Sequence, residues 1–396
     1  MRAALVVPVL LVAILAPAAS ASPNCTTGVP WTAFRGGVAM TQPDGLVLVG
    51  PDGATSRIDM DLGGAEPEVA AQGDGTLLLA WRDADGVAPA PMMTAAVRED
   101  GTVTPPVEVA ADTDSMPLLR PPWLIFWSGS PSSPFTVRVR DGAPVGSPQP
   151  YDGRPVPNRL SFPQAGPVWE DFASHFGLVA PDLRVTRLVP VLRLNATVSG
   201  RADDGRQGVW VTGADGIGSA PVAAHLTRRR LGRVVRPFGT GAVRGQAAIA
   251  SRGARAADAL AVTGPLRHAA LRARRLTPSG GLGPVRRLTR TGWLEVAASA
   301  DLGHKRTLVV MSERRGARMR LLAARVRGGH ASLVGLTRFS RRTIVWGSVT
   351  VFAGYRDTRP TLRWLEQSPS GEAIAVVVQR LDDRLRPGRA VRAVRC

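Results

Sequence analysis

The sequence is poor in cysteine, lysine and long apolar runs. Two of its 396 residues are cysteine, and Lys305 is the single lysine. No segment reaches the roughly 18 consecutive apolar residues typical of a membrane-spanning helix. The sequence also lacks H-x-x-x-H and C-x-x-C metal motifs, a G-x-S-x-G nucleophile motif and a phosphate-binding G-x-x-x-x-G-K loop. We therefore expect no metal ion, no cofactor and no catalytic triad.

The first residues are typical of a cleaved secretory signal. Arg2 gives a positive start, residues 3–16 carry no charge, and the small residues 19–21 fit the rule for signal peptidase. We expect residues 1–21 to be removed and the mature chain, 22–396, to be secreted to the extracellular side, with no membrane span. The alternative, an uncleaved anchor, is disfavoured because Pro8 and Pro17 interrupt a helix.

Both cysteines belong to the expected mature chain. Cys25 lies near its start, and Cys396 is the last residue of the sequence. In an exported protein an even pair of cysteines favours a disulfide. We predict a bond between Cys25 and Cys396 that ties the two ends together.

A unit of strand, polar hairpin, strand, tight turn and strand recurs along the chain. The last apolar residue of each unit's second strand marks its register. These residues are Val97, Leu226, Leu276, Val326 and Leu381 and, less regularly, Val49, Val139 and Leu183. The registers are 42 to 55 residues apart, a spacing typical of propeller blades.

The repeat predicts an all-β fold, a single closed β-propeller of seven or eight four-stranded blades over residues 22–396. Two β-sandwiches are the alternative, but they require no repeat. Residues 317–327 are rich in helix formers, yet they align with the β-branched residues 375–378, so we expect a strand there. In period and closure the chain resembles secreted bacterial β-propellers of the sialidase-like superfamily, although it has no S-x-D-x-G-x-x-W Asp-box. We expect a monomer.

Charge is unevenly distributed along the chain. The net charge is −6 up to residue 200 and +25 after it, which together give +19. Arginine pairs well with anionic groups, so the second half predicts binding of an anionic polysaccharide or cell-wall polymer. The alternative is a compositional bias towards arginine on a solvated surface, and export disfavours nucleic acid as a partner. The candidate ligand-binding residues are Arg228, Arg229, Arg230, Arg274, Arg275, Arg325, Arg327, Arg380 and Arg384.

Three carboxylates occupy equivalent places in the repeat. Asp83, Glu313 and Glu366 each follow the first strand of their unit by two residues, at the start of the hairpin. Converging on one face of a propeller, they could act as acid and base in a glycoside hydrolase or lyase. The alternative is that hairpin tips are polar because they are wet. Since no catalytic motif is present, the favoured hypothesis is a non-catalytic binding or scaffold module.

Overall fold

The chain is built from β-strands. The computed structural model describes residues 31–395 except 35–36, 43–44, 63–66, 73–74, 84–88, 99, 115–116, 130–132, 152–167, 173–174, 180–184, 191–196, 207, 215–219, 228, 242, 304, 346–347, 353–358, 371 and 383. The described residues contain no helix, and therefore none that is long and apolar enough to cross a membrane. The predicted signal peptide, Cys25, Cys396, Leu183 and Arg228 lie outside the described residues.

The first half of the chain forms four antiparallel sheets, numbered here in chain order. In each sheet, neighbouring strands are consecutive in sequence. Sheet 1 contains β1 (Trp31–Phe34), β2 (Gly37–Gln42), β3 (Gly45–Val49) and β4 (Thr55–Asp59), and sheet 2 contains β5 (Glu68–Ala71), β6 (Leu77–Arg82), β7 (Ala90–Val97) and β8 (Val107–Thr113). Sheet 3 contains β9 (Leu118–Arg120), β10 (Trp123–Ser128), β11 (Ser133–Arg140) and β12 (Ala143–Pro150), and sheet 4 contains β13 (Val168–Phe172), β14 (His175–Val179) and β15 (Val185–Pro190).

The second half repeats this arrangement. Sheet 5 contains β16 (Thr197–Asp203), β17 (Val209–Ala214) and β18 (Val222–Leu226), and sheet 6 contains β19 (Ala248–Ser251), β20 (Ala257–Thr263), β21 (Ala270–Leu276) and β22 (Leu282–Arg287). Sheet 7 contains β23 (Trp293–Asp301), β24 (Arg306–Arg315), β25 (Arg318–Arg327) and β26 (His330–Gly335). Sheet 8 contains β27 (Thr343–Ile344), β28 (Thr350–Phe352), β29 (Thr361–Gln367), β30 (Ala373–Arg380) and β31 (Val391–Arg395). The strand expected at 317–327 is therefore confirmed as β25.

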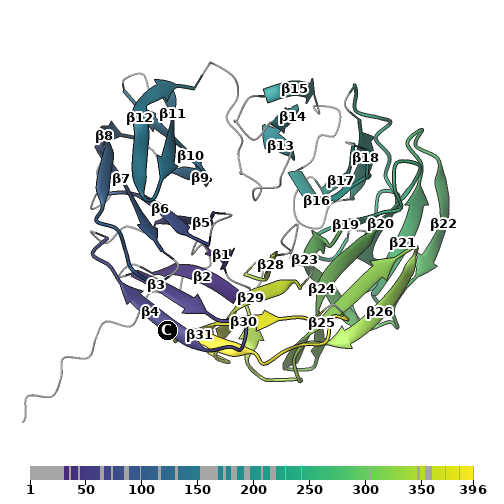
Figure 1. Ribbon diagram of the computed structural model, residues 1–396. Helices are drawn as coiled ribbons and strands as arrows, with labels where there is room; N and C mark the ends of the chain where they lie inside the picture. The colour runs from purple at the N-terminus through teal and green to yellow at the C-terminus, as the bar shows by residue number, and fades with distance from the viewer. Residues whose placement is uncertain are drawn as a thin grey trace, which may run out of the picture.

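The eight described sheets are arranged around a common centre, with β1, β5, β9, β13, β16, β19, β23 and β28 nearest to it (Figure 1). The core lies between sheets, because strands alternate apolar side chains towards both neighbours. Shared clusters of buried apolar residues join sheets 1 and 2, 2 and 3, 5 and 6, 6 and 7, and 7 and 8. This packing gives the all-β, propeller-like architecture that the repeat predicts.

The register predicted from the repeat is confirmed in the described sheets. Val97, Leu226, Leu276, Val326 and Leu381 are each at most 1% exposed. Each pairs across the turn that follows it, with Val103, Leu231, Leu282, Ala331 and Pro387 respectively. The innermost strand of each sheet was not part of the predicted repeat unit. These strands differ in length, with four residues in β5 and β19 and nine in β23, and they lack a shared pattern.

Sheets 1 and 8 meet where the two ends of the described chain come together. Each is formed by strands from its own end of the chain, and no strand is exchanged between them. Their contact, which we call the seam, is a cluster of buried apolar side chains: Val38, Met40, Val47 and Val49 from sheet 1 and Leu365, Val376, Val378 and Val394 from sheet 8. The two ends are thus joined by side-chain packing.

Candidate functional site

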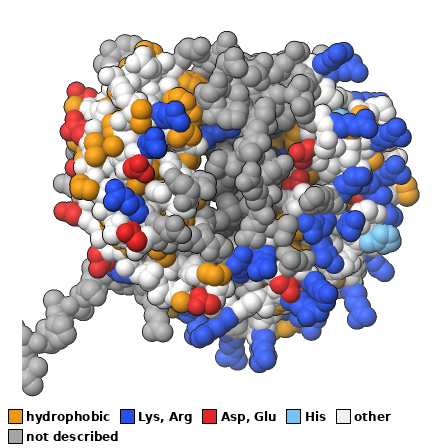
Figure 2. All heavy atoms as spheres, viewed as in Figure 1, with side chains coloured by type: hydrophobic (Ala, Val, Ile, Leu, Met, Phe, Trp, Pro, Cys, Tyr) orange, Lys and Arg blue, Asp and Glu red, His pale blue; other side chains and the backbone are white. Residues whose placement is uncertain are grey.

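Arginine side chains gather on the turns that follow the third strand of sheets 5 to 7 and strand β30 of sheet 8. We call these turns, at 227–230, 277–281, 328–329 and 381–390, the rim turns, and the end of the ring on which they lie the rim-turn face. Figure 2 shows Lys and Arg side chains concentrated over this half of the ring. The exposed arginines on or beside these turns, which we call the basic arc, are Arg229, Arg230, Arg233, Arg275, Arg327, Arg384, Arg386 and Arg389.

The rim turns of sheets 6 and 7 each pack on the preceding sheet, so the basic arc extends across sheets 5 to 7. The turn of sheet 6 packs on sheet 5: a Cβ atom added to Gly280 would lie 2.7 Å from Cδ of Arg233. The turn of sheet 7 packs on sheet 6 in the same way. There Gly329, with φ of +81°, leaves no room for a Cβ atom beside the guanidinium groups of Arg252 and Arg286.

Arg252 and Arg286 share one buried carboxylate beneath this turn. Asp258 is 0% exposed, and both of its oxygens accept hydrogen bonds from Arg252, at 2.7 and 2.9 Å. Nη2 of Arg286 lies 3.4 Å from Oδ1 of the same carboxylate. Two guanidinium groups on one carboxylate leave one positive charge in excess. This group was not predicted from the sequence, because nothing in a repeat of strands marks which charged residues will meet.

The structure places the predicted arginines in different roles. Arg229, Arg230, Arg275, Arg327 and Arg384 are exposed in the basic arc. Arg274 instead donates hydrogen bonds to the carbonyl oxygens of Gly283, at 2.7 Å, and Pro237, at 2.9 Å, so its guanidinium group links sheet 6 to the segment after sheet 5. Arg325 and Arg380 are half-buried, and Arg228 lies outside the described residues.

The corresponding turns of sheets 1 to 3 carry acidic residues. Asp52, Asp100 and Asp141 lie on them, and the first two accept hydrogen bonds from backbone N–H groups two residues later. The hydroxyl and N–H groups of Thr102 hold the pKa of Asp100 below its ordinary value. Because an ionised carboxylate repels an anion, a polyanion would be attracted to sheets 5 to 8 and not to sheets 1 to 3.

The three hairpin carboxylates lie at the opposite ends of the strands. Asp83 is exposed, directly after β6. The carboxylate of Glu313 is bound by Arg315, at 3.1 Å, and by Arg320. The carboxylate of Glu366 is bound by Arg342, at 3.5 Å, and Arg392, at 3.0 Å. Both glutamates therefore have arginine partners of their own, and their catalytic role stays a prediction.

No metal centre is formed by the described residues. In them, no three His, Cys, Asp or Glu side chains are close enough together to hold a metal ion. His225 and Asp204 form a buried pair, with Nε2 and Oδ2 2.9 Å apart, that packs between sheets 5 and 6. The imidazole ring stacks on Trp210 with 4.1 Å between ring centroids, and Trp210 donates a hydrogen bond to the carbonyl oxygen of Gly253 in sheet 6.

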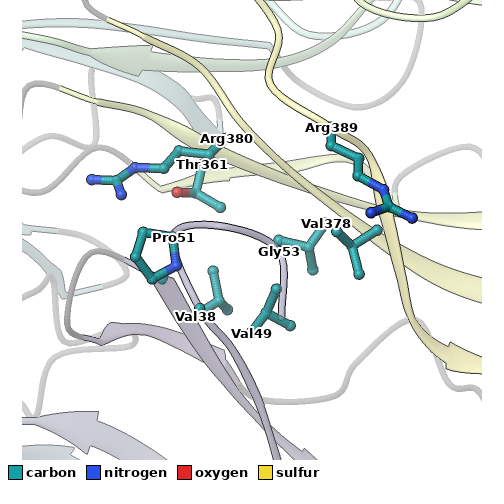
Figure 3. A pocket seen from close by; sticks show the side chains of 11 residues that line it. Val38, Val49, Pro51, Gly53, Thr361, Val378, Arg380 and Arg389 are labelled. Carbon is teal, nitrogen blue, oxygen red and sulfur yellow. The ribbon is translucent and has the colours of Figure 1, made fainter. Parts of the chain in front are cut away.

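A shallow pocket opens at the seam, on the rim-turn face. Figure 3 shows Val38, Val49 and Pro51 of sheet 1 facing Val378 of sheet 8, with Arg380 and Arg389 at its two sides. Its empty volume is about 280 Å³, which includes space open to solvent. Because this space is partly open to solvent, we assign no separate ligand to the pocket.

Comparison with known proteins identifies no family. No family model and no curated protein matches the sequence. Solved structures with propeller-type folds are similar to it at low identity. They include puromycin hydrolase (17% identity, TM-score 0.31, covering 82% of this chain and 46% of that one) and prolyl oligopeptidase B from Galerina marginata (8%, TM-score 0.41, 93% and 50%). A neuraminidase-like protein from A/bat/Guatemala is similar at 9% identity and a TM-score of 0.31, covering 60% of this chain and 59% of that one.

The chain spans about half the length of puromycin hydrolase. At these identities and TM-scores the similarities do not indicate a substrate or a reaction.

Proposed function

We propose that the chain is a secreted, closed eight-bladed β-propeller that acts as a non-catalytic binding module for an anionic polymer, such as a cell-wall polysaccharide. The polymer lies along the basic arc on the rim-turn face. One observation carries the proposal: exposed arginines of successive sheets lie on rim turns at the same end of the strands, and the rim turns of sheets 6 and 7 pack on the preceding sheet, so their charges act on one extended ligand.

Within the described part of the chain, four arginines of the basic arc lack carboxylate partners, which supports this role. Arg230, Arg275, Arg327 and Arg384 form no ion pair with any carboxylate of the described residues. Guanidinium groups bind phosphate, sulfate and carboxylate groups through two parallel hydrogen bonds, which favours arginine for this purpose. A polymer that neutralises several of them releases counterions, so its affinity should fall steeply with added salt.

The test is binding to immobilised heparin as a model polyanion, measured from 0.05 to 0.5 M salt. The variant R230E/R275E/R327E should bind at least ten-fold more weakly than the wild type at 0.15 M salt, with a shallower salt dependence. Its fold should persist, because exposed substitutions usually change stability by less than about 0.5 kcal/mol.

The matched control reverses three arginines in sheets 1 and 3, as R57E/R138E/R140E. It changes the net charge equally but leaves the basic arc intact, so its affinity should stay within about three-fold of the wild type. If both variants weaken binding to the same degree, net charge alone determines binding and the proposed site is wrong.

A further inference from the structure

A second basic surface lies at the opposite end of sheet 7. Its exposed arginines are on the hairpin between β24 and β25 and on the segment that leads from sheet 7 to sheet 8. We call this surface the hairpin cluster: Arg314, Arg315, Arg318, Arg338 and Arg341. The two segments are held together, because the backbone N–H of Met319 donates to the carbonyl oxygen of Ser340, at 2.9 Å, and Ser340 donates back at 3.0 Å.

Aromatic rings orient two of these guanidinium groups. Cζ of Arg315 lies 4.7 Å from the ring centroid of Phe339, and Cζ of Arg314 lies 5.1 Å from that of Trp293. The side chain of Arg315 is nevertheless 67% exposed. A guanidinium group fixed on a ring loses less entropy when it binds an anion, so these arginines are partly preorganised for a ligand.

The hairpin cluster has an excess of positive charge. Glu313 is bound by Arg315 and by Arg320, which also lies over Phe339. In the part of the chain that the structure describes, no carboxylate pairs with Arg314, Arg318, Arg338 or Arg341. Four of the five arginines are thus available to an anionic partner.

The two basic surfaces face in opposite directions. Arg318 and Arg327 are the two ends of the ten-residue strand β25. At about 3.3 Å per residue they are roughly 30 Å apart, with Arg318 in the hairpin cluster and Arg327 in the basic arc. An anionic chain lying flat on one face cannot also lie on the other.

We propose that one molecule holds two anionic polymer chains at once, one on the basic arc and one on the hairpin cluster, and so cross-links them. The inference rests on the proposed function, since the basic arc supplies one of the two sites. It gives the protein a role in joining polymer chains in addition to binding one.

A sandwich assay tests this. The protein is bound to heparin-coated beads, the beads are washed, and fluorescent heparin is added. The fluorescence captured per molecule of bound protein measures how many molecules bind a second heparin chain. The wild type should capture label. The variant R314E/R318E/R338E should still bind the beads but capture at least five-fold less. These three positions leave both arginine partners of Glu313 in place, so no buried carboxylate is left unpaired.

The controls separate this inference from the proposed function. R57E/R138E/R140E carries the same charge change and should capture label as the wild type does. If the hairpin variant captures label normally, or if the control loses capture equally, the second surface is wrong. If a single chain wraps around the edge of the ring, the wild type binds the beads without capturing label, which also overturns the inference. Failure of the wild type to bind the beads would instead refute the proposed function.

Discussion

Glu68 is a carboxyl group that folding removes from water. It lies in the inner strand β5 opposite Ala80 of β6, and burial raises its pKa from 4.5 to about 6. Because the folded state holds this proton more tightly than the unfolded state, protonation contributes stability that is complete below about pH 4.5 and is lost as the pH rises through about 6.

The variant Glu68→Gln should therefore be more stable than the wild type at pH 7.5, by roughly 1–2 kcal/mol, and the difference should vanish near pH 4.5. Urea unfolding at the two pH values measures it, with the exposed Glu372→Gln as a control that should change little at either. A stabilisation that is equal at both pH values would show that ionisation of Glu68 is not its cause.

Asp301 also makes the stability of the folded state fall as the pH rises. Its carboxylate accepts backbone N–H groups of Asp203, at 2.8 Å, and Gly303, at 2.9 Å, and so links the inner strands of sheets 5 and 7. Burial, together with the nearby charge of Asp203, raises the pKa of Asp301. Like Glu68, it gives up stability as the pH rises through its folded pKa.

The rim turn of sheet 7 packs closely on sheet 6. Gly329 needs a positive φ and lies against the guanidinium groups that hold Asp258. Gly316, in the hairpin of the same sheet, has φ of +57° and no atom within 4 Å of an added Cβ. Both glycines therefore have a positive φ, but only Gly329 has neighbouring atoms, among the described residues, that an added Cβ would meet.

Gly316→Ala should cost about 1 kcal/mol, which is the penalty for a left-handed residue. Gly329→Ala should cost clearly more, because the added methyl group displaces Arg252 and Arg286 and leaves the buried carboxylate poorly paired. Chemical denaturation of both variants gives the comparison. Equal losses of stability would mean that the two arginines move aside freely.

The strands beyond the inner one could be predicted from the sequence because apolar alternation and turn residues recur with each sheet. Val97 and Leu276 thus mark equivalent positions even though their sheets share little sequence. Pairing between distant charges could not be predicted in this way. Arg286 and Asp258 are 28 residues apart, and Arg274 differs from its neighbour Arg275 only in which side of β21 it occupies. Contacts between sheets decide these roles, and a one-dimensional pattern does not contain them.

At the scale of the whole molecule, the links between sheets indicate what the predicted disulfide would replace. Short links, 60–67, 114–117 and 288–292, join the fourth strands of sheets 1, 2 and 6 to the first strand of the next sheet. Sheets 8 and 1 have no such link within the chain. Cys396 follows β31 directly and residues 26–30 separate Cys25 from β1, so a bond between the cysteines would form a connection of similar length.

We expect the double variant C25S/C396S to unfold faster than the wild type and to lose up to about 5–6 kcal/mol of stability, the limit set by chain entropy for so long a loop. Stopped-flow unfolding gives the rate, and peptide mapping without reductant shows whether the bond is present. Two free thiols in the wild type would contradict the prediction.

The seam also determines how the molecule would assemble if it opened. Separated, sheets 1 and 8 present complementary apolar faces, with Val38 and Met40 on one and Val376 and Val378 on the other. These faces are different surfaces, so sheet 1 of one molecule fits sheet 8 of the next in a head-to-tail contact that does not close after two copies. Molecules opened at the seam would therefore grow into filaments, and the predicted disulfide would guard against polymerisation as well as unfolding.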